Sequence, residues 1–444
     1  MSNSLETMLG LPKKVEFDEQ QLLAIEQCTD VAKRLVAVTG GAGTGKTLLI
    51  KEIYNNLTAA GYTVAVSAPT GKAAKRILES TGIMALTNHR LLGYGMPIES
   101  EEEQNDGTKK VVRLSTGPKY TRARPLEFDV LLCDEYAMVN QEIHRNLVDA
   151  LKPRAMMRVF GDVNQLKPIE GEGYAKKNAP QLPSPFEMLL QKFNPVTLKT
   201  VHRQAEGSGV AANAAAILKG QVPKKLDDFE IRWSDEPIKS LINYIEDQSA
   251  NGGHDFSTTD AQVITVMNKT WVGVKRLNPV IQQLFWKQNR RGIELPRHRW
   301  SEDEKVRIQV GSKVVYTSNT YDLDNGHYAL NGEVGVVMEI DYDLGVVDID
   351  FGDRVVSVPP LTVLVSNDGS VREFDPRKNI DLAYALTTHK MQGSEVPHVV
   401  YLLNKSTSFG QSRRNFYTAV SRARKSCVVI SDQGSMLKSV KFEG

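Results

Sequence analysis

One glycine-rich octapeptide near the start of the chain limits its possible folds more than any other feature. It matches the pattern G-x-x-x-x-G-K-[ST] and lies between an apolar run, 35–40, and a helical run, 48–61. In such a strand–loop–helix setting, the glycines allow backbone N–H groups to surround phosphate oxygens at a helix N-terminus. The sequence therefore predicts a parallel α/β domain with a nucleotide site at this loop. The loop residues are Gly40, Gly41, Ala42, Gly43, Thr44, Gly45, Lys46 and Thr47.

Acidic and polar side chains that suit the same site follow later strands. We expect Lys46 to reach the β- and γ-phosphates of ATP, and Thr47 to ligate Mg²⁺. Asp134 and Glu135 follow the apolar run VLLC, where Asp134 would hold the metal and Glu135 would polarise the attacking water. Gln165 lies in the turn after the next strand-like run, 156–162. It is placed to hydrogen-bond the γ-phosphate or the water, although by itself it is an ordinary polar turn residue.

The order of elements along the chain predicts an α/β fold with two inserted β segments. Strands alternate with helices up to about residue 195 and again near both ends of the remaining chain, which is typical of parallel sheets covered on both faces. Short alternating strands fill 297–375 and suggest a small barrel. We find no internal repeat. The expected division is 1–93 with 125–195 for the first α/β domain, 94–124 for an inserted hairpin, 196–296 with 376–444 for the second α/β domain, and 297–375 for the barrel.

Composition excludes some classes of protein but does not select a partner. The chain of 444 residues is 41% hydrophobic and 24% charged, which is typical of a globular protein. It has no apolar run of about 20 residues, so we expect no membrane span. Neither a signal peptide nor paired cysteines are evident, and we expect a cytoplasmic protein with Cys28, Cys133 and Cys427 reduced. The net charge of +2 is compatible with a basic groove confined to one surface.

Several segments, taken in chain order, resemble the motifs of superfamily 1B DNA helicases of the RecD-like branch. The resemblance covers nearly the whole chain, and the compact length is most like the phage Dda helicase. The motif pattern departs from the family at Tyr136-Ala137 and Ser421, neither of which removes a catalytic group. The matching segments are 17–25 (Q motif), 40–47 (I), 68–77 (Ia), 87–93 (Ib), 134–138 (II), 161–168 (III), LKTVHRQ at 198–204, 385–395 (V) and 416–424 (VI).

This resemblance implies two RecA-like P-loop domains with ATP in the cleft between them, and an SH3-like barrel. The second domain would direct Arg203 and Arg422 at the γ-phosphate, where an arginine can increase the rate by about 10³–10⁵. Gln21 would read adenine, and Glu395 would contact the ribose. The family's strand-contacting motifs imply a nucleic-acid track that consists of Pro69, Thr70, Lys72, His89, His389, Gln392 and Ser394.

The function implied by the resemblance is ATP-dependent 5′-to-3′ translocation on single-stranded DNA and unwinding of forked duplex DNA. The cofactors would be ATP and Mg²⁺, and the protein would act as a monomer, with replication or recombination proteins as partners. It would serve replication, recombination or repair, as a phage protein in the host cytoplasm or a cellular one. Two alternatives stay open: a DNA-stimulated translocase that remodels protein–DNA complexes without unwinding, and a P-loop kinase or other small-molecule enzyme. The segment 94–124 is expected to be the strand-separating pin.

Overall fold

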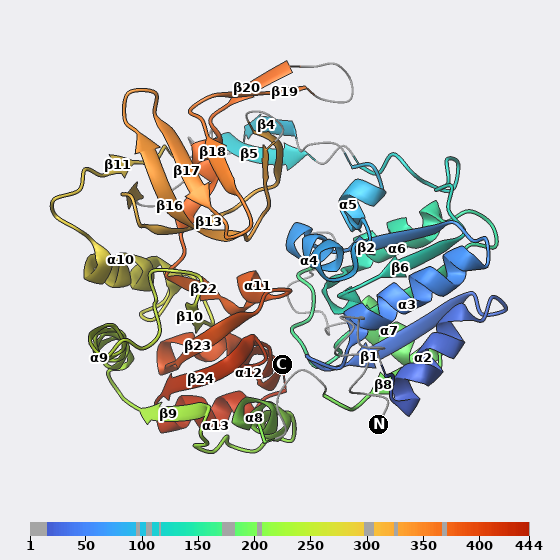
Figure 1. The fold of residues 1–444 in the computed structure, drawn as a ribbon, viewed down its shortest axis with the longest axis horizontal. Coiled ribbons are helices and arrows are strands. Elements are labelled where there is room, and N and C mark those ends of the chain that lie inside the picture. Colours follow the sequence, from blue (N-terminus) through green and yellow to red (C-terminus); the bar gives the residue numbers. More distant parts are fainter. Residues whose placement is uncertain are drawn as a thin grey trace, which may run out of the picture.

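The computed structural model describes residues 16–94, 98–103, 109–114, 117–170, 183–201, 207–296, 306–323, 327–365 and 371–443. Two α/β halves lie beside one another, and a β domain lies over the second half (Figure 1). Among the described residues, no helix is long and apolar enough to cross a membrane.

The first half is built on a parallel six-stranded sheet in the order β3-β2-β6-β7-β1-β8. Both faces are covered: α2, α3 and α4 pack on one face, and α5, α6 and α7 pack on the other. The strands are β1 (Leu35–Gly40), β2 (Val64–Ala68), β3 (Leu86–Thr87), β6 (Val130–Cys133), β7 (Met156–Gly161) and β8 (Val196–Leu198). The helices are α2 (Glu19–Thr29), α3 (Lys46–Ala59), α4 (Gly71–Thr81), α5 (Asn88–Leu91), α6 (Gln141–Ala150) and α7 (Pro185–Lys192).

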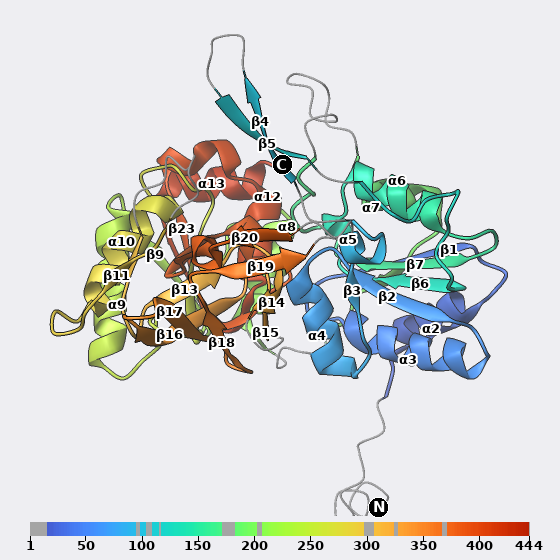
Figure 2. The same cartoon turned by 90° about the horizontal axis from the view of Figure 1, so that it is seen from above.

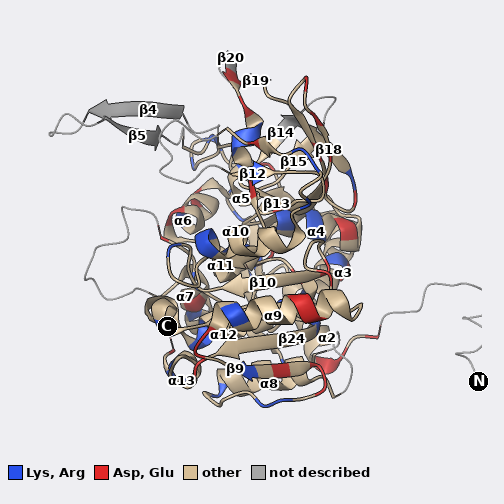
Figure 3. Ribbon diagram, turned by 90° about the vertical axis from the view of Figure 1, so that its left-hand side faces the viewer, with Lys and Arg blue, Asp and Glu red and all other residues tan. Residues whose placement is uncertain are grey.

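The second half has a parallel five-stranded sheet in the order β22-β10-β23-β24-β9. One face packs against α8, α12 and α13, and the other packs against α9 and α10. The strands are β9 (Phe229–Trp233), β10 (Ala261–Thr265), β22 (Ala385–Thr387), β23 (Val396–Leu403) and β24 (Ala423–Ser431). The helices are α8 (Gly209–Leu218), α9 (Pro237–Ala250), α10 (Val274–Phe285), α11 (Thr388–Met391), α12 (Arg413–Val420) and α13 (Gln433–Lys441). Residues of both charges lie on α9 (Figure 3).

The inserted β domain shares its core with the second half. Its five-stranded antiparallel sheet has the order β18-β17-β16-β13-β21. Buried residues of these strands form one cluster with residues of α9 and α10, so the insert is fused to the second half. The sheet strands are β13 (Lys313–Tyr316), β16 (Val334–Asp341), β17 (Val346–Asp350), β18 (Val355–Val358) and β21 (Ile380–Leu382), and the smaller pairs are β11 (Ile293–Glu294) with β12 (Arg307–Ile308), β14 (Thr320–Leu323) with β15 (His327–Ala329), and β19 (Thr362–Val365) with β20 (Val371–Phe374).

A hairpin projects from the first half between α5 and β6 (Figure 2). Its strands, β4 (Ile98–Glu103) and β5 (Lys109–Leu114), pair antiparallel with Ile98 opposite Leu114. The returning arm is fixed at its root, because the N–H groups of Lys119 and Tyr120 both donate to the carbonyl of Leu92 at 2.9 and 3.1 Å.

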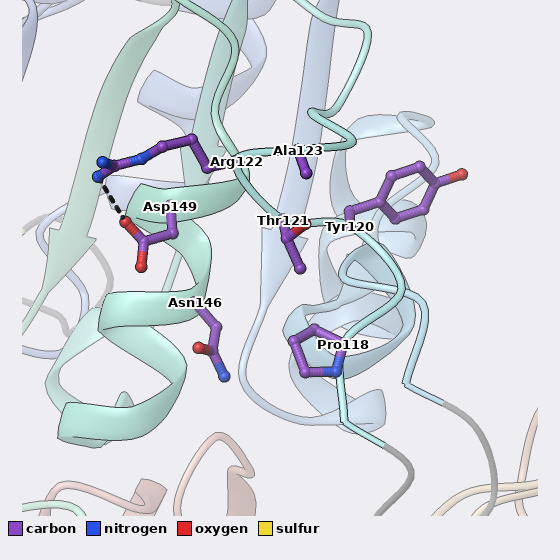
Figure 4. Close-up of a pocket in the computed structure, with 7 residues that line it drawn as sticks. All are labelled: Pro118, Tyr120, Thr121, Arg122, Ala123, Asn146 and Asp149. Atoms are coloured by element: carbon purple, nitrogen blue, oxygen red, sulfur yellow. Dashed lines mark hydrogen bonds and ion pairs between the residues drawn. The ribbon is translucent and has the colours of Figure 1, made fainter.

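A pocket beside this root lies between the segment 117–124 and α6 (Figure 4). The guanidinium of Arg122 pairs with Asp149 across it at 3.1 Å. The lining consists of Pro118, Tyr120, Thr121, Arg122, Ala123, Asn146 and Asp149, and none of these is among the nucleotide, metal or track residues expected from the sequence.

Three short strands lie on the other side of the expected domain boundaries. β8 belongs to the first sheet, although residue 196 was expected to open the second domain. β21 belongs to the sheet of the insert, and β11 pairs with β12 of the insert. The boundaries differ because short strands take their place from tertiary pairing, which a local pattern does not contain.

Candidate nucleotide and nucleic-acid site

The glycine-rich loop has the shape of a phosphate cradle. Gly43 and Gly45 have φ angles of 78° and 84°, in the left-handed region that favours glycine. The loop leads directly into the N-terminus of α3, where free N–H groups and the helix dipole attract anions. Lys46 lies against the loop: its Nζ donates to the carbonyls of Gly40 at 2.7 Å and Gly41 at 2.9 Å.

Gln21 supports this loop from beneath. Its Nε2 donates to the carbonyl of Thr44 at 3.1 Å, and its Oε1 accepts the N–H of Asp18 at 3.1 Å. A Cβ atom at Gly45 would lie 2.6 Å from this Nε2, so the close contact requires glycine there. Both polar atoms of the Gln21 amide are engaged within the protein. Reading of adenine by Gln21 would require one of these bonds to exchange, and it stays a prediction.

Asp134 and Glu135 form a buried pair of carboxylates at the end of β6. The Oδ1 of Asp134 accepts the N–H of Glu135 at 2.8 Å. Burial, and next the charge of Glu135, raise the pKa of Asp134 to about 6, whereas the charges of Lys46 and Arg76 oppose this rise. Glu135 has a φ of 49°, a strained conformation of the kind that clusters at functional sites. Its Oε2 is buried without a hydrogen-bond partner. Adjacent carboxylates with an unpartnered oxygen fit a divalent cation.

Asp162, in the turn after β7, joins the two halves through Tyr417 of α12. The Tyr417 hydroxyl donates to Oδ2 of Asp162 at 2.7 Å. The Nε2 of Gln165 reaches the same oxygen at 3.4 Å, and its Oε1 is buried without a partner. A Cβ atom at Gly41 would lie 3.1 Å from the Tyr417 hydroxyl, so this tyrosine also lies against the phosphate loop.

The rest of this turn is also held by the second half. The guanidinium of Arg414 donates to the carbonyl of Val163 at 2.7 Å. The N–H of Leu166 donates to Oγ1 of Thr418 at 3.0 Å, and its carbonyl accepts from Nε2 of Gln392 at 3.2 Å. Any relative movement of the halves must therefore move or release the turn that carries Gln165.

The two predicted arginines have different outcomes. Arg422 is buried, and its guanidinium donates to the carbonyls of Thr418 at 3.0 Å and Ser394 at 3.3 Å, and to Ser421 Oγ at 2.9 Å. The side chain is thus held beside motif V by its own half. Arg203 lies outside the described residues.

Arg76 of α4 contributes to the site and was missed from the sequence. Its Nη2 pairs with Oε1 of Glu395 at 3.0 Å, which is a further link between the two halves. Burial lowers the pKa of Arg76, but the charges of Glu395, Glu135 and Asp134 outweigh it and raise this pKa above its usual value. The structure therefore gives Glu395, the predicted ribose contact, a protein partner. Arg76 lies inside the segment 68–77 that resembles motif Ia, and this resemblance could have identified it from the sequence.

A short internal repeat, also missed, places matching elements in both halves. The octapeptides LTNHRLLG (86–93) and LTTHKMQG (386–393) each supply an edge strand, a four-residue helix and a left-handed glycine. In each, a threonine caps the helix by accepting an N–H bond, at 3.2 Å for Thr87 and 3.3 Å for Thr387. His89 and His389 occupy the same repeat position and are both exposed.

The remaining track residues differ in exposure. Thr70 caps α4 by accepting the N–H of Ala73 at 3.2 Å, and Pro69 beside it is half-buried. Lys72 is turned toward the insert, where its Nζ donates to the carbonyl of Gly332 at 2.8 Å. Ser394 is buried with an unpartnered Oγ. Lys72 therefore contacts the insert, and its predicted contact with the nucleic acid stays a prediction.

Two parallel sheets, with a phosphate loop on one and a polar helix from the other against it, define a tandem RecA-like P-loop nucleoside triphosphatase. Residues 16–232 match the AAA domain family, and residues 382–430 match the UvrD-like helicase C-terminal domain.

Known relatives and solved structures agree with this class. An ATP-dependent RecD2 DNA helicase of Deinococcus radiodurans is 30% identical over 94% of this chain, which spans 49% of that protein. The RecD subunit of the RecBCD enzyme of Mycolicibacterium smegmatis is 26% identical over 96% of the chain and 73% of its own length. The Pif1 helicase of Candida albicans shares the fold at a TM-score of 0.58, with 20% identity, 96% coverage of this chain and 97% of that one. The chain is therefore similar to RecD-like DNA helicases over nearly its whole length. A particular nearness to the phage Dda helicase stays a prediction.

Proposed function

We propose that this chain is an ATP-dependent DNA helicase that moves 5′ to 3′ on single-stranded DNA and unwinds forked duplex. The observation that carries the proposal is a set of hydrogen bonds from the second half to the turn 162–167 of the first half. Four of its side chains, those of Gln392, Arg414, Tyr417 and Thr418, bind this turn, which also carries Gln165. Hydrolysis of the nucleotide beside Gln165 would thereby alter the relative position of the two halves.

The residues of the cleft have complementary roles in ATP hydrolysis. Lys46 and the loop amides would bind the phosphates, while Thr47 and Asp134 would hold Mg²⁺. Bound Mg²⁺ neutralises charge on the transferred phosphate. Glu135 would orient the attacking water with its unpartnered Oε2. Arg422 and Arg203 would complete the site from the second half once the cleft closes.

The repeated elements around α5 and α11 support a DNA track across both halves. Each presents an exposed histidine followed by a basic residue, Arg90 or Lys390, at the end of an edge strand. Side chains of this kind bind phosphates without reading sequence. A DNA strand bound by both elements would advance when the distance between them changes. The repeat therefore gives the motor two equivalent DNA-binding elements.

The hairpin and the domain division belong to the same proposal. The segment 94–124 would separate the strands, since it projects from the first half directly after α5 (Figure 2). The division follows the expected ranges, shifted by the short strands β8, β11 and β21. The protein would act as a monomer in the cytoplasm during replication, recombination or repair.

Polarity rests on the family resemblance, so duplexes with opposite tails test it. Equal duplexes with a 5′ tail, a 3′ tail or a fork are mixed with the protein and ATP, and strand release is followed. We expect release from the 5′-tailed and forked substrates alone. Preferential release from the 3′-tailed duplex would refute the polarity. Hydrolysis of ATP stimulated by single-stranded DNA, with no strand released from any substrate, would favour the remodelling translocase.

A further inference from the structure

Two histidines and an aspartate converge on the α9 and α10 face of the second sheet. His254 lies in the loop between α9 and β10, Asp260 directly precedes β10, and His398 lies in β23. β10 and β23 are parallel neighbours, and the N–H of His398 donates to the carbonyl of Asp260 at 3.1 Å. Strand pairing therefore fixes two of the three residues side by side.

The spacing of the three side chains is that of a metal site. One nitrogen or oxygen from each residue lies within 4.8 Å of those from the other two. The rings of His254 and His398 are 3.4 Å apart with an interplanar angle of 16°. Because each lone pair lies in the plane of its ring, binding of one ion by both histidines would require the stacked rings to rotate about their Cβ–Cγ bonds.

The surroundings orient one histidine as a ligand. Nδ1 of His398 lies 2.8 Å from Oγ of Ser426 on the adjacent strand β24, and this leaves Nε2 for a metal. A hydrogen bond of this kind at the second ring nitrogen accompanies nearly all histidine ligands. The charge of the exposed Lys425 opposes a cation weakly, because solvent screens it.

This cluster is distinct from the nucleotide site. His398 lies on the same strand face as Val400 and Leu402, which pack in the core with α9 and α10. Val399 and Tyr401 point to the opposite face, toward Tyr417 of α12. None of the three cluster residues therefore has a role in the proposed ATP chemistry.

We propose that His254, Asp260 and His398 bind a divalent transition metal, with Zn²⁺ as the ion that fits best. Two imidazoles and one carboxylate are ligands for zinc and its neighbours, whereas Mg²⁺ and Ca²⁺ prefer oxygen ligands alone. The three residues leave one tetrahedral position for water. The bound ion would fasten the loop 251–260 to β23 and so stabilise the second half.

The test is metal binding by the full-length protein after treatment with a chelator. Zn²⁺ is titrated calorimetrically without nucleotide or DNA, and Co²⁺ is used in parallel because tetrahedral Co²⁺ absorbs strongly in the visible range. We expect one Zn²⁺ per chain at this site, a rise in Tm with Zn²⁺, and the tetrahedral Co²⁺ spectrum. The variants His254→Ala, Asp260→Asn and His398→Ala should each weaken binding at least about a hundredfold, and Ser426→Ala about tenfold.

His389→Ala is the matched control, because His389 is an exposed histidine away from the cluster. It should keep the Zn²⁺ affinity, the Co²⁺ spectrum and the Tm shift of the parent. His254 lies in a loop, so its variant reports on the site even if substitution in β23 impairs folding. Equal Zn²⁺ affinity in the parent and in folded His254→Ala would overturn the proposal, as would an octahedral Co²⁺ spectrum. Helicase activity does not enter this test.

Discussion

The hydroxyl of Tyr417 donates a 2.7 Å hydrogen bond to Oδ2 of Asp162, and the two residues are 255 positions apart in the chain. This bond joins α12 of the second half to the turn after β7 of the first. Burial and the charge of Asp162 hold the pKa of Tyr417 well above its usual value, so the hydroxyl keeps its proton and remains a donor. Gln165 contacts the same carboxylate oxygen, and the bond therefore connects α12 to the side chain beside the expected γ-phosphate.

Tyr417→Phe should weaken the coupling between the halves while the cleft remains intact. A hydrogen bond to a charged group contributes about 1.5–3 kcal/mol, so we expect the DNA-stimulated kcat to fall at least about tenfold. The Kd for ATP, measured by fluorescence of a labelled analogue, should change by less than about threefold. Tyr342→Phe is the control, because the Tyr342 hydroxyl donates to the carbonyl of Arg291 in a surface loop. If Tyr417→Phe keeps the parental kcat, this hydroxyl contributes to the packing of α12 and not to the coupling between the halves.

Lys46→Ala and Glu135→Gln should separate binding from hydrolysis. Lys46 lies against the phosphate loop at Gly40 and Gly41, so its removal should abolish both ATP turnover and tight nucleotide binding. Glu135→Gln keeps the shape of the side chain but removes the charge that polarises water, and we expect ATP to bind without being hydrolysed. Equilibrium nucleotide binding and phosphate release, each with and without single-stranded DNA, measure the two effects. Equal turnover with and without DNA in the parent would contradict a DNA-driven motor.

Arg422→Ala should reduce kcat by orders of magnitude, as expected for an arginine that stabilises the transferred phosphate. Its nucleotide affinity should remain within about tenfold, because the ground state depends on Lys46 and the loop. Arg422 also bonds to Thr418 and Ser394, so circular dichroism and Tm must first show that the variant folds. Arg422→Lys retains a charge without the planar fork and should recover little of the rate. A folded Arg422→Ala protein with near-parental kcat would make this arginine structural.

The sequence predicted the features that depend on local patterns. The phosphate loop, the buried strand before Asp134 and the α/β alternation are all local, and the structure has them as parallel sheets with flanking helices. The contacts of Tyr417 with Asp162 and of Arg76 with Glu395 join segments 255 and 319 residues apart. Such pairs depend on how the halves meet, and no local pattern contains this information.

Two further misses have different causes. The repeat between 86–93 and 386–393 was visible in the sequence, but it is too short for a search for structural repeats. The contact of Lys72 with Gly332 depends on the position of the insert, which no local pattern in α4 predicts.

Lys72 should make stability depend on pH at the seam between α4 and the insert. Loss of solvation lowers its pKa in the folded protein to about 8, below the value of about 10.4 expected in the unfolded chain. Between these values the unfolded state binds more protons, so stability should rise as the pH increases from about 8 to 10.4. Lys72→Met should flatten this part of the Tm profile, whereas Lys51→Met, at an exposed position on α3, should not. The same slope in the parent and in Lys72→Met would show that other groups cause it.

The hairpin can be removed without disturbing its anchored root. Lys119 and Tyr120 bond to Leu92, and Arg122 pairs with Asp149 of α6, so residues 117–124 should stay. Replacement of 96–116 by a short Gly/Ser linker removes β4 and β5 alone. Each base-pair step costs about 1.4 kcal/mol to unstack, and a motor without a wedge cannot prevent reannealing behind each step. We therefore expect DNA-stimulated ATPase and single-strand translocation to persist while unwinding of forked duplex collapses. Unwinding at the parental rate would instead place the wedge elsewhere, with the inserted β domain as the next element to delete.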